Sequence, residues 1–416
     1  MRILQVADVS IESAISGSER VLYEQSTCLA KRGHEVHLLT RRLPVHKSSK
    51  EKIAGVYEWR YTFNRKLPHL FFRSIFFNCR HSFISIQKES FSHIINFHQP
   101  FSATGVLSSP AVRGIPLIYT CLSFSFEEYA SRTASPTNYN YREWVLFRLH
   151  LHSRKLLEKR ALRRSDQVVV LSEYTKKKLE KTYSLPPVKI HVIPGGVDLN
   201  RFRPRADKQA VRRSLGISDS HLVLLTIRNL EPRMGLENLI LAFSRVLEAQ
   251  TQPALLILGG EGPLAPRLKR LVRQNGMADS VKFTGYIPEE ELPSYYRMAD
   301  LFILPTEELE GFGLVTVEAL ASGLPVLGTP VGGTKEILAH MGSRFLFADS
   351  KPDSMANQIL EAIRTWAKDS ETYDKISLKC RKVAEDHYSW DAHVDKLEHL
   401  FHLAIRQRNS SLRTDP

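Results

Sequence analysis

The sequence is poor in cysteine, and the few cysteines are widely scattered. Cys28, Cys79, Cys121 and Cys380 lie far apart along the 416 residues, without the pairwise spacing that zinc sites use. This spacing argues against a disulfide-stapled scaffold and a zinc ribbon. It predicts reduced thiols that pack as small apolar side chains in a cytoplasmic protein.

Long hydrophobic runs are also missing. No stretch approaches the roughly 20 consecutive apolar residues that a membrane-spanning helix needs. The first residues form a short apolar run that ends at Asp8, which predicts a buried strand and is too short for a secretory signal. We find no low-complexity tract and no internal repeat with a period of about 20–50 residues.

What the sequence does have is the balance of a soluble globular protein, with 43% apolar and 25% charged residues. Its length predicts two domains of about 200 residues each. The net charge of +14 is unevenly distributed: residues 1–190 hold 30 Lys and Arg against 15 Asp and Glu, and the rest hold 28 against 29. The N-terminal half is therefore expected to face an anionic partner, whether nucleic acid, an anionic membrane surface or a phosphorylated substrate.

Short β-rich apolar runs alternate with helical patterns in both halves, which predicts α/β domains with parallel sheets. The boundary is expected in the stretch 186–204, which is dense in proline and glycine, and the pattern is wholly helical from about 352 to 406. Strands are expected at Ile3–Val6, Val36–Leu39, Ile94–Phe97, Leu117–Tyr119, Val168–Leu171 and Ile190–Ile193, then at Leu222–Ile227, Ala254–Leu258, Val281–Phe283, Leu301–Leu304 and Pro325–Leu327.

One motif carries clear chemistry, the run Glu310-Gly-Phe-Gly-Leu-Val-Thr-Val-Glu318. Gly311 and Gly313 have no side chains, so backbone amides there can approach an oxyanion beside a helix N-terminus. Glu318 is positioned to reach vicinal hydroxyls such as those of a ribose, and Glu310 lies on the loop itself. Two carboxylates around an anion-binding turn suit a ligand that has a diphosphate between two polyols. The plain alternative is a helix that happens to begin with Gly-Phe-Gly.

The residues around this motif resemble the donor-site signature of the retaining GT-B glycosyltransferases of family 4. In that signature a Glu is followed eight positions later by a second Glu, then by a Gly-x-Pro-Val turn, and then by Gly-Gly before a Glu. The resemblance extends over nearly the whole chain, in order. It is carried by Gly17-Ser-Glu-Arg20, Pro194–Asp198 with Phe202, Gly260-Glu-Gly-Pro263, Gly285-Tyr-Ile287, Glu310–Glu318, Gly323-Leu-Pro-Val326, Gly332-Gly-Thr-Lys-Glu336 and Tyr388-Ser-Trp390.

The resemblance implies a GT-B fold of the α/β class, with two Rossmann-like, doubly wound parallel-sheet domains that face each other across a cleft. Residues 1–190, with a crossing helix at about 388–408, would bind the acceptor, and residues 200–375 would bind the nucleotide sugar. Glu310 would contact the donor sugar and Glu318 the ribose. The other implied donor-binding residues are Gly311, Phe312, Gly313, Leu314, Gly260, Gly262, Tyr286 and Ile287.

The resemblance also implies no cofactor and no essential metal, because a basic pair neutralises the leaving diphosphate. Family members carry an Arg and a Lys after the first strand of the second domain. Here those positions hold Asn229 and Met234, and an arginine stands one residue earlier in each case, at Arg228 and Arg233. We predict that these two arginines are catalytic. The plain alternative is two solvated arginines on a loop.

A second departure concerns the acceptor side. Many family members have a His soon after the fourth strand of the first domain, where this chain has Leu122. His98 follows another strand and is the remaining candidate for a sugar contact, with a loop-capping histidine as the alternative. Glu127 or Glu128 could serve as base, or the leaving phosphate could take the acceptor proton. The resemblance places Gly17 and Ser18 in a glycine loop at the acceptor or phosphate.

The stretch Trp59–Lys88 mixes many aromatic side chains with Arg60, Arg65, Lys66, Arg73 and Arg80. A basic helix with an aromatic face suits an anionic membrane surface, and the alternative is an ordinary core helix. Adjacent phenylalanines at 71–72 and 76–77 cannot all point inward, which keeps the membrane hypothesis open.

The leading hypothesis is thus a retaining glycosyltransferase that uses a UDP- or GDP-sugar. Its acceptor would be a glycan or lipid-linked molecule in cell-surface polysaccharide or glycolipid synthesis, on the cytoplasmic face of the membrane. A nucleic-acid-binding protein is the first rival, but no recognisable reading element is present, so no nucleic-acid partner is expected. A catalytically degenerate sugar-binding protein is the second, supported by Leu122 and opposed by the presence of Glu310 and Glu318.

Overall fold

The computed structural model describes residues 1–12, 17–65, 68–133, 140–204, 208–367 and 369–414. The chain divides into two compact units, Met1–Ile193 with Trp390–Pro416, and Pro194–Ser389. The division falls at Pro194, inside the stretch rich in proline and glycine. The last helix, α15 (Trp390–Thr414), belongs to the first unit and packs against α1 (Gly17–Lys31) there.

The first unit is built on a sheet that has eight strands in the described residues, in the order β3-β4-β2-β1-β5-β6-β7-β8. Neighbouring strands are parallel except for the antiparallel pair β3–β4. The strands are β1 (Arg2–Val6), β2 (Glu35–Arg41), β3 (Lys50–Ile53), β4 (Val56–Tyr61), β5 (Ile94–Phe97), β6 (Leu117–Thr120), β7 (Gln167–Val170) and β8 (Ile190–Val192). The other helices are α2 (Pro68–Glu89), α3 (Pro100–Leu107), α4 (Ser125–Arg132), α5 (Tyr141–Arg164) and α6 (Glu173–Tyr183).

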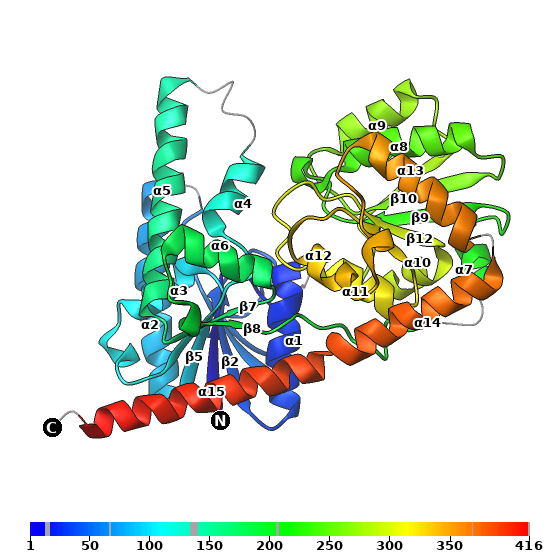
Figure 1. Ribbon diagram of the computed structural model, residues 1–416. Helices are drawn as coiled ribbons and strands as arrows, with labels where there is room; N and C mark the ends of the chain where they lie inside the picture. The colour runs from blue at the N-terminus through cyan, green and yellow to red at the C-terminus, as the bar shows by residue number, and fades with distance from the viewer. Residues whose placement is uncertain (13–16, 66–67, 134–139, 205–207, 368, 415–416) are drawn as a thin grey trace. The chain divides into compact units, whose positions relative to one another are not determined.

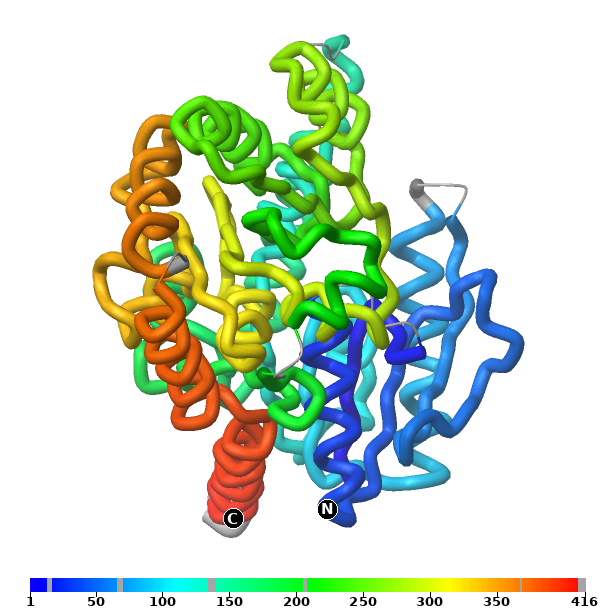
Figure 2. Tube along the Cα trace, turned by 90° about the vertical axis from the view of Figure 1, so that its right-hand side faces the viewer, coloured from blue at the N-terminus to red at the C-terminus, as the bar shows by residue number. Residues whose placement is uncertain are grey.

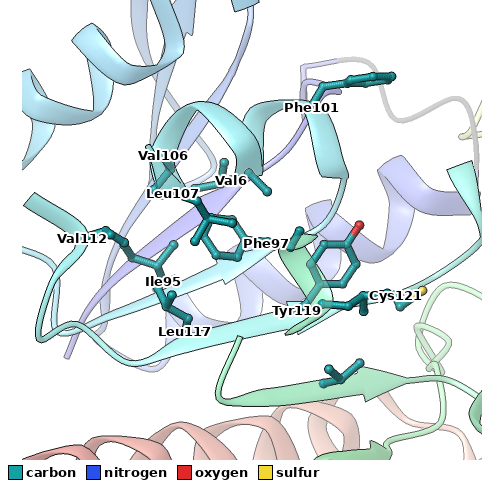
Figure 3. Packing of buried hydrophobic residues seen from close by; sticks show 14 of the residues in the cluster. Val6, Ile95, Phe97, Phe101, Val106, Leu107, Val112, Leu117, Tyr119 and Cys121 are labelled. Carbon is teal, nitrogen blue, oxygen red and sulfur yellow. The ribbon is translucent and has the colours of Figure 1, made fainter. Parts of the chain in front are cut away.

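Both faces of this sheet are covered, because successive side chains of a strand point to opposite faces. Leu4 and Val6 of β1 enter a core shared with α2 and α3, which Figure 3 shows around Phe97 and Tyr119. Ile3 enters the opposite core, under α1 and α15. The strands are apolar on both faces, as expected for a parallel sheet. This explains why short continuous apolar runs located them in the sequence.

The sequence analysis missed the hairpin β3–β4. Its first strand reads Lys-Glu-Lys-Ile and lies at the edge of the sheet, so it shows no apolar run. Ala54 and Gly55 both have positive φ, 47° and 89°, which is the geometry of a tight two-residue hairpin turn. The interpretation of 59–88 as one basic helix is therefore wrong: β4 ends at Tyr61 and α2 begins at Pro68.

The hairpin anchors the loop that leads from β1 towards α1. The buried Glu58 carboxylate on β4 accepts hydrogen bonds from the Ser10 hydroxyl at 2.6 Å and from the Arg60 Nε at 2.8 Å. Arg60 also forms ion pairs of 2.8 Å with Glu12 and with Glu51 of β3. A buried cation with several carboxylate partners holds this loop firmly, since leaving either charge unpaired is costly.

The second unit contains a parallel sheet that has, in the described residues, the order β11-β10-β9-β12-β13. Figures 1 and 2 show α8 and α13 side by side on one face, with α9 on the same side, while α10 and α11 lie on the other. The strands are β9 (Leu222–Ile227), β10 (Ala254–Gly259), β11 (Val281–Gly285), β12 (Leu301–Leu304) and β13 (Val326–Gly328). The helices are α7 (Lys208–Ser214), α8 (Leu236–Ala249), α9 (Ala265–Gln274), α10 (Leu292–Met298), α11 (Leu314–Ala321), α12 (Gly332–Ala339), α13 (Pro352–Ala362) and α14 (Ser370–His387).

The strand order reverses between β9 and β12, which creates a topological switch point in the second sheet. In doubly wound folds, ligands bind outside the carboxyl ends of the strands at such a point. The loops after β9 and β12 hold Arg228, Arg233 and Glu310, and the fold therefore brings the main predicted donor-site residues to one sheet edge.

In the first unit, the buried Glu158 of α5 fixes the start of α4. Its carboxylate accepts a hydrogen bond from the Ser125 backbone N–H at 3.0 Å, and another from the Tyr183 hydroxyl on α6. Burial is the main cause that raises the pKa of Glu158 to about 7. Since α4 carries Glu127 and Glu128, this contact positions both candidate bases.

We expect the stability of the first unit to fall as pH rises through 7, because the folded state binds a proton at Glu158 that the unfolded state releases near pH 4.5. Linkage puts the contribution at about 3 kcal/mol, present in full below pH 4.5 and lost above 7. Glu158→Gln mimics the protonated acid. Its melting temperature should match that of the wild type at pH 4.5 and exceed it at pH 8. A difference that does not change with pH would contradict this assignment.

Candidate functional site

The glycine turn after β12 forms the start of α11. Gly313 is the residue that precedes the helix and has φ 101°, a conformation that favours glycine. As a glycine, Gly313 offers no side chain to cap this helix N-terminus. A Cβ at Gly313 would lie 2.7 Å from the Thr334 hydroxyl and 3.2 Å from the Thr316 hydroxyl. Both hydroxyls are buried without a hydrogen-bond partner in the described residues, so polar groups surround the turn where an anion is predicted.

The Gly332-Gly333 pair packs closely against the backbone of this turn. A Cβ on Gly332 would be only 1.9 Å from the Glu310 carbonyl oxygen, and one on Gly333 would be 2.7 Å from the Gly311 carbonyl oxygen. The Gly333 amide donates to the Glu310 carbonyl at 3.0 Å. The second glycine motif is thus required so that α12 can pack backbone to backbone against the loop that carries Glu310.

A polar triad occupies the switch point. The Arg228 guanidinium donates to the Glu310 carboxylate at 2.5 Å and also to the Thr306 hydroxyl, which in turn donates to Glu310 at 3.2 Å. The side chains of Arg228 and Glu310 are only 6% and 12% exposed. Thr306 lies in the loop that follows β12 and is completely buried. The triad holds one cation and one carboxylate in a fixed geometry with little solvent screening.

Arg233 makes two hydrogen bonds to backbone groups of the same loop. Its guanidinium donates to the Leu309 carbonyl at 3.2 Å, and its own carbonyl accepts from the Glu307 amide at 3.0 Å. Leu309 has φ 60°, which is a strained conformation for a leucine. Such strain is found where the surroundings over-determine a functional loop. Arg233 is therefore not a freely solvated side chain, and its carbonyl and guanidinium together hold the Glu310 loop.

The second glycine turn lies beside the triad. A Cβ on Gly260, which has φ 116°, would meet the Arg228 carbonyl oxygen at 2.0 Å, and one on Gly262 would meet the Leu230 carbonyl oxygen at 2.5 Å. After β11, Tyr286 is half-exposed and Ile287 is buried against Gly259. The turn around Gly260 therefore fixes the backbone of Arg228, while Tyr286 remains accessible to a ligand.

Glu318 lies in the second turn of α11 and is almost completely buried. Its carboxylate accepts a hydrogen bond of 2.8 Å from the Tyr296 hydroxyl of α10. Phe312, the residue between the two glycines, is also buried and packs edge-on against Tyr388 with ring centroids 5.8 Å apart. Leu314 begins the helix. The roles of these residues toward a donor remain predictions.

In the first unit, His98 lies at the carboxyl end of β5 but is buried. Its Nε2 is 2.8 Å from the Gln5 Oε1 and 3.2 Å from the Asn96 amide nitrogen, and Asn96 accepts from Thr120 at 2.9 Å. Burial lowers the pKa of His98 to about 3, with His393 of α15 as a smaller cause. The ring is therefore neutral at physiological pH and belongs to a buried polar network under α1. A sugar contact by His98 remains a prediction.

The other acceptor-side candidates lie at the starts of helices. Gly17 and Ser18, which the resemblance places in a glycine loop, begin α1, and the preceding residues 13–16 lie outside the described residues. Glu127 forms an ion pair of 2.5 Å with Lys178 of α6, which opposes a role as free base, while Glu128 is half-buried. Leu122 follows β6 and is partly exposed.

The sequence analysis missed three threonines. Thr306 holds Arg228 and Glu310 together, and Thr316 and Thr334 surround Gly313. Each is completely or almost completely buried. Threonine in an apolar strand or helix looks like a β-branched core residue, so only its place beside a motif residue could have marked it. No group of three or more His, Cys, Asp or Glu in the described part of the chain is arranged to hold a metal ion.

Two units that are each built on a mainly parallel sheet define the GT-B fold, and solved structures confirm this class. Sucrose-phosphate synthase from Thermosynechococcus elongatus aligns with a TM-score of 0.81 and 20% identity, over 98% of this chain and 100% of that one. Anabaena HepE, solved in complex with UDP-glucose, aligns with a TM-score of 0.74 and 18% identity, over 97% and 100%. Identities this low establish the fold alone.

Two family profiles match consecutive parts of the sequence. The profile described as Glycosyltransferase Family 4 matches residues 15–201, and the one described as Glycosyl transferases group 1 matches residues 207–383. The chain belongs to the family-4 glycosyltransferases, which confirms the resemblance seen in its motifs.

One relative is a GDP-mannose-dependent alpha-(1-6)-phosphatidylinositol monomannoside mannosyltransferase from Mycobacterium tuberculosis. It is 30% identical over 205 residues, which are 48% of this chain and 53% of that protein. The chain spans about half the length of the curated relatives it matches.

The substitution Thr306→Val tests whether the geometry of the Arg228–Thr306–Glu310 triad matters for donor binding. The substitution keeps the volume but removes the hydroxyl shared by Arg228 and Glu310, and buried hydrogen bonds to charged groups contribute roughly 1.5–3 kcal/mol. We expect affinity for nucleoside diphosphate sugars, measured by calorimetry, to fall about 10-fold or more.

Thr226→Val is the matched control, because the Thr226 hydroxyl of β9 is buried without a hydrogen-bond partner in the described residues. This control should bind like the wild type. Equal affinity in both variants would show that Thr306 does not position the site.

Proposed function

We propose that this protein is a retaining glycosyltransferase that moves a sugar from a UDP- or GDP-sugar to a glycan or lipid-linked acceptor. The observation that carries the proposal is the Arg228–Thr306–Glu310 triad at the switch point, beside the N-terminus of α11, which follows Gly313. A cation, a carboxylate and a row of backbone amides at one sheet edge suit a ligand with a sugar attached to a diphosphate.

In the proposed reaction, the bond between the anomeric carbon and the diphosphate oxygen breaks, and the acceptor oxygen bonds to that carbon on the same face. The acceptor proton passes to the leaving phosphate oxygen. Negative charge grows on the diphosphate as the bond breaks, so donors held ready at that point stabilise the transition state more than the ground state. We assign this role to Arg228, Arg233 and the amides of Gly313 and Leu314.

Glu310 would accept hydrogen bonds from hydroxyls of the donor sugar, and Glu318 from the ribose. Gly260, Gly262, Tyr286 and Ile287 would surround the nucleotide. Two similar proteins support a UDP- or GDP-sugar, since one depends on GDP-mannose and the other was solved with UDP-glucose.

The first unit would bind the acceptor, and its excess of basic residues supports an anionic one. We propose work on the cytoplasmic face of the membrane in the synthesis of a cell-surface polysaccharide or glycolipid. None of the helices in the described ranges is both long and apolar enough to cross a membrane, so contact with the membrane would be peripheral.

One observation favours a second candidate, a nucleotide-sugar-binding protein without transferase activity. Met234 stands where family members carry a Lys, and its side chain is buried. The engagement of Arg228 and Arg233 on the Glu310 loop opposes this candidate, because both supply positive charge near the position that the missing Lys would occupy.

Glu318 can be tested apart from its contact with Tyr296. Glu318→Gln should weaken donor binding about 10-fold or more, because it loses a charged acceptor for the ribose hydroxyls. Tyr296→Phe removes the same internal hydrogen bond but leaves the carboxylate, so its donor affinity should stay near that of the wild type. If calorimetry shows equal losses in both variants, Glu318 serves the fold and not the ribose.

Transfer should persist in excess EDTA, because the positive charge at the diphosphate comes from arginine. Arg228→Ala and Arg233→Ala should each lower kcat about 100-fold or more, as loss of a transition-state donor does elsewhere. Arg270→Ala on the exposed face of α9 is a control that should keep full turnover. Activity lost on chelation and restored by Mg²⁺ would contradict the metal-free mechanism.

A further inference from the structure

Helix α5 has an unusual outward face. Tyr141, Trp144, Leu146, Leu149 and Leu156 are all 45–80% exposed. A surface helix normally turns its apolar residues to the core and its charges to solvent. Figure 1 shows the first turns of α5 extending beyond the neighbouring helices of the first unit. The exposed apolar residues are concentrated in this part.

The inward face of α5 accounts for its attachment to the unit. Phe147 stacks on Tyr129 of α4 with ring centroids 5.7 Å apart, and His150 lies against Phe72 of α2 at 5.9 Å. The Arg154 guanidinium lies over the Tyr129 ring at 4.4 Å. These contacts fix which side of the helix faces the core. By helical geometry, Leu149 and Leu156 point away from this inward side, and Trp144 and Leu146 lie on its two flanks.

The charge of α5 is almost all of one sign. It carries eight Lys and Arg but only two acids, Glu143 and Glu158. Glu143 hydrogen-bonds the Asn140 amide at 3.0 Å in the N-terminal capping box, and Glu158 is buried. Apart from Glu143 at the start of the helix, the outward face is therefore both apolar and basic.

A shallow groove runs along this face. It has a volume of about 490 Å³ and its lining includes Phe126, Trp144, Leu149 and the basic side chains Arg148 and Lys155. Arg148 lies over the Trp144 ring at 5.8 Å and Lys155 over the Phe126 ring at 5.2 Å. Each cation thus stands at the edge of an apolar surface, the arrangement that places ammonium and guanidinium groups among headgroups while rings enter the acyl boundary.

We propose that the outward face of α5 docks the protein on an anionic lipid bilayer. The biological purpose of this docking rests on the proposed function, but the residues that define the surface do not depend on that function. A second copy of the chain is a poor occupant, because a self-complementary contact would bring two predominantly basic faces together. A soluble anion would not require the exposed Trp144, Leu146 and Leu149.

The proposed membrane-docking surface on α5 differs from the one expected from the sequence, which lay in residues 59–88. In α2, Phe71 and Phe72 pack against the core of the first unit, and Ile75 and Phe83 are buried within it. Phe77 is the large apolar residue of α2 that is exposed. Most aromatic residues of α2 are therefore ordinary core residues. The adjacent helix α5 presents the larger apolar and basic surface.

The experiment is co-sedimentation of the full chain with vesicles of phosphatidylglycerol and phosphatidylcholine, or of phosphatidylcholine alone. The wild type should bind the anionic vesicles and not the neutral ones, and high salt should weaken the binding. Arg148→Glu with Lys155→Glu reverses two charges, which lowers the net charge of the face by four, and should lower binding roughly 100-fold or more. Trp144→Ala with Leu149→Ala should lower the vesicle binding that remains at high salt.

Two controls carry the same change of charge. Arg270→Glu with Arg273→Glu acts on α9, whose outward residues include no exposed large apolar side chain, and should bind like the wild type. Arg73→Glu with Arg80→Glu acts on α2 and should cost less than the α5 pair. If either control loses as much binding as the α5 variant, the surface assigned to α5 is wrong.

Tryptophan fluorescence gives a second readout. Trp366 and Trp390 are buried and Trp59 donates its N–H to His37, whereas Trp144 is exposed. Anionic vesicles should therefore shift the emission to the blue, and Trp144→Phe should remove the shift.

Titration with UDP and GDP in parallel separates the two proposals. Retained nucleotide binding without vesicle binding overturns only the docking surface, and the reverse overturns only the proposed function.

Discussion

The second unit depends on backbone packing at glycines where the loops of one sheet edge meet. Gly235 approaches the Pro305 carbonyl, Gly260 the Arg228 carbonyl and Gly332 the Glu310 carbonyl, and a Cβ at any of them would lie about 2 Å or less from the oxygen. No rotamer change can relieve a clash with backbone. These contacts connect the loops after β9, β10, β12 and β13, and therefore fix the positions of Arg228 and Glu310.

This constraint explains how a buried ion pair can persist at this sheet edge. Desolvation of Arg228 and Glu310 is costly unless each has further hydrogen bonds, and Thr306 supplies one to each. Glycine packing removes the freedom by which the two loops could separate and hydrate the pair. A ligand that takes over either partner then meets a preorganised group, with little cost in side-chain ordering.

The fold was largely readable from the sequence because buried parallel strands are short, continuous apolar runs. Strands β5, β9 and β12 occur at the predicted residues, whereas β3 was missed because an edge strand needs no apolar pattern. The glycine and glutamate motifs predicted a donor site, and the structure brings them to the sheet edge where the loops after β9 and β12 meet. Thr306 and Thr334 were not found, because their importance comes from neighbours distant in the chain. His98 shows the opposite limit, since its position after β5 was correct but its burial under α1 was not visible in the sequence.

The charge asymmetry seen in the sequence has different structural meanings in the two units. In the second unit, buried arginines have carboxylate partners, such as Arg212 with Asp300 at 2.6 Å and Arg228 with Glu310. In the first unit, Arg60 is likewise paired inside a carboxylate cluster and adds nothing to the surface field. Much of the excess stands instead on α5, whose acids are used for capping and burial. Net charge alone could not distinguish a nucleic-acid groove from a membrane surface. The exposed leucines and Trp144 among these cations favour the proposed membrane surface, because aliphatic side chains add little to phosphate recognition but can enter an acyl boundary.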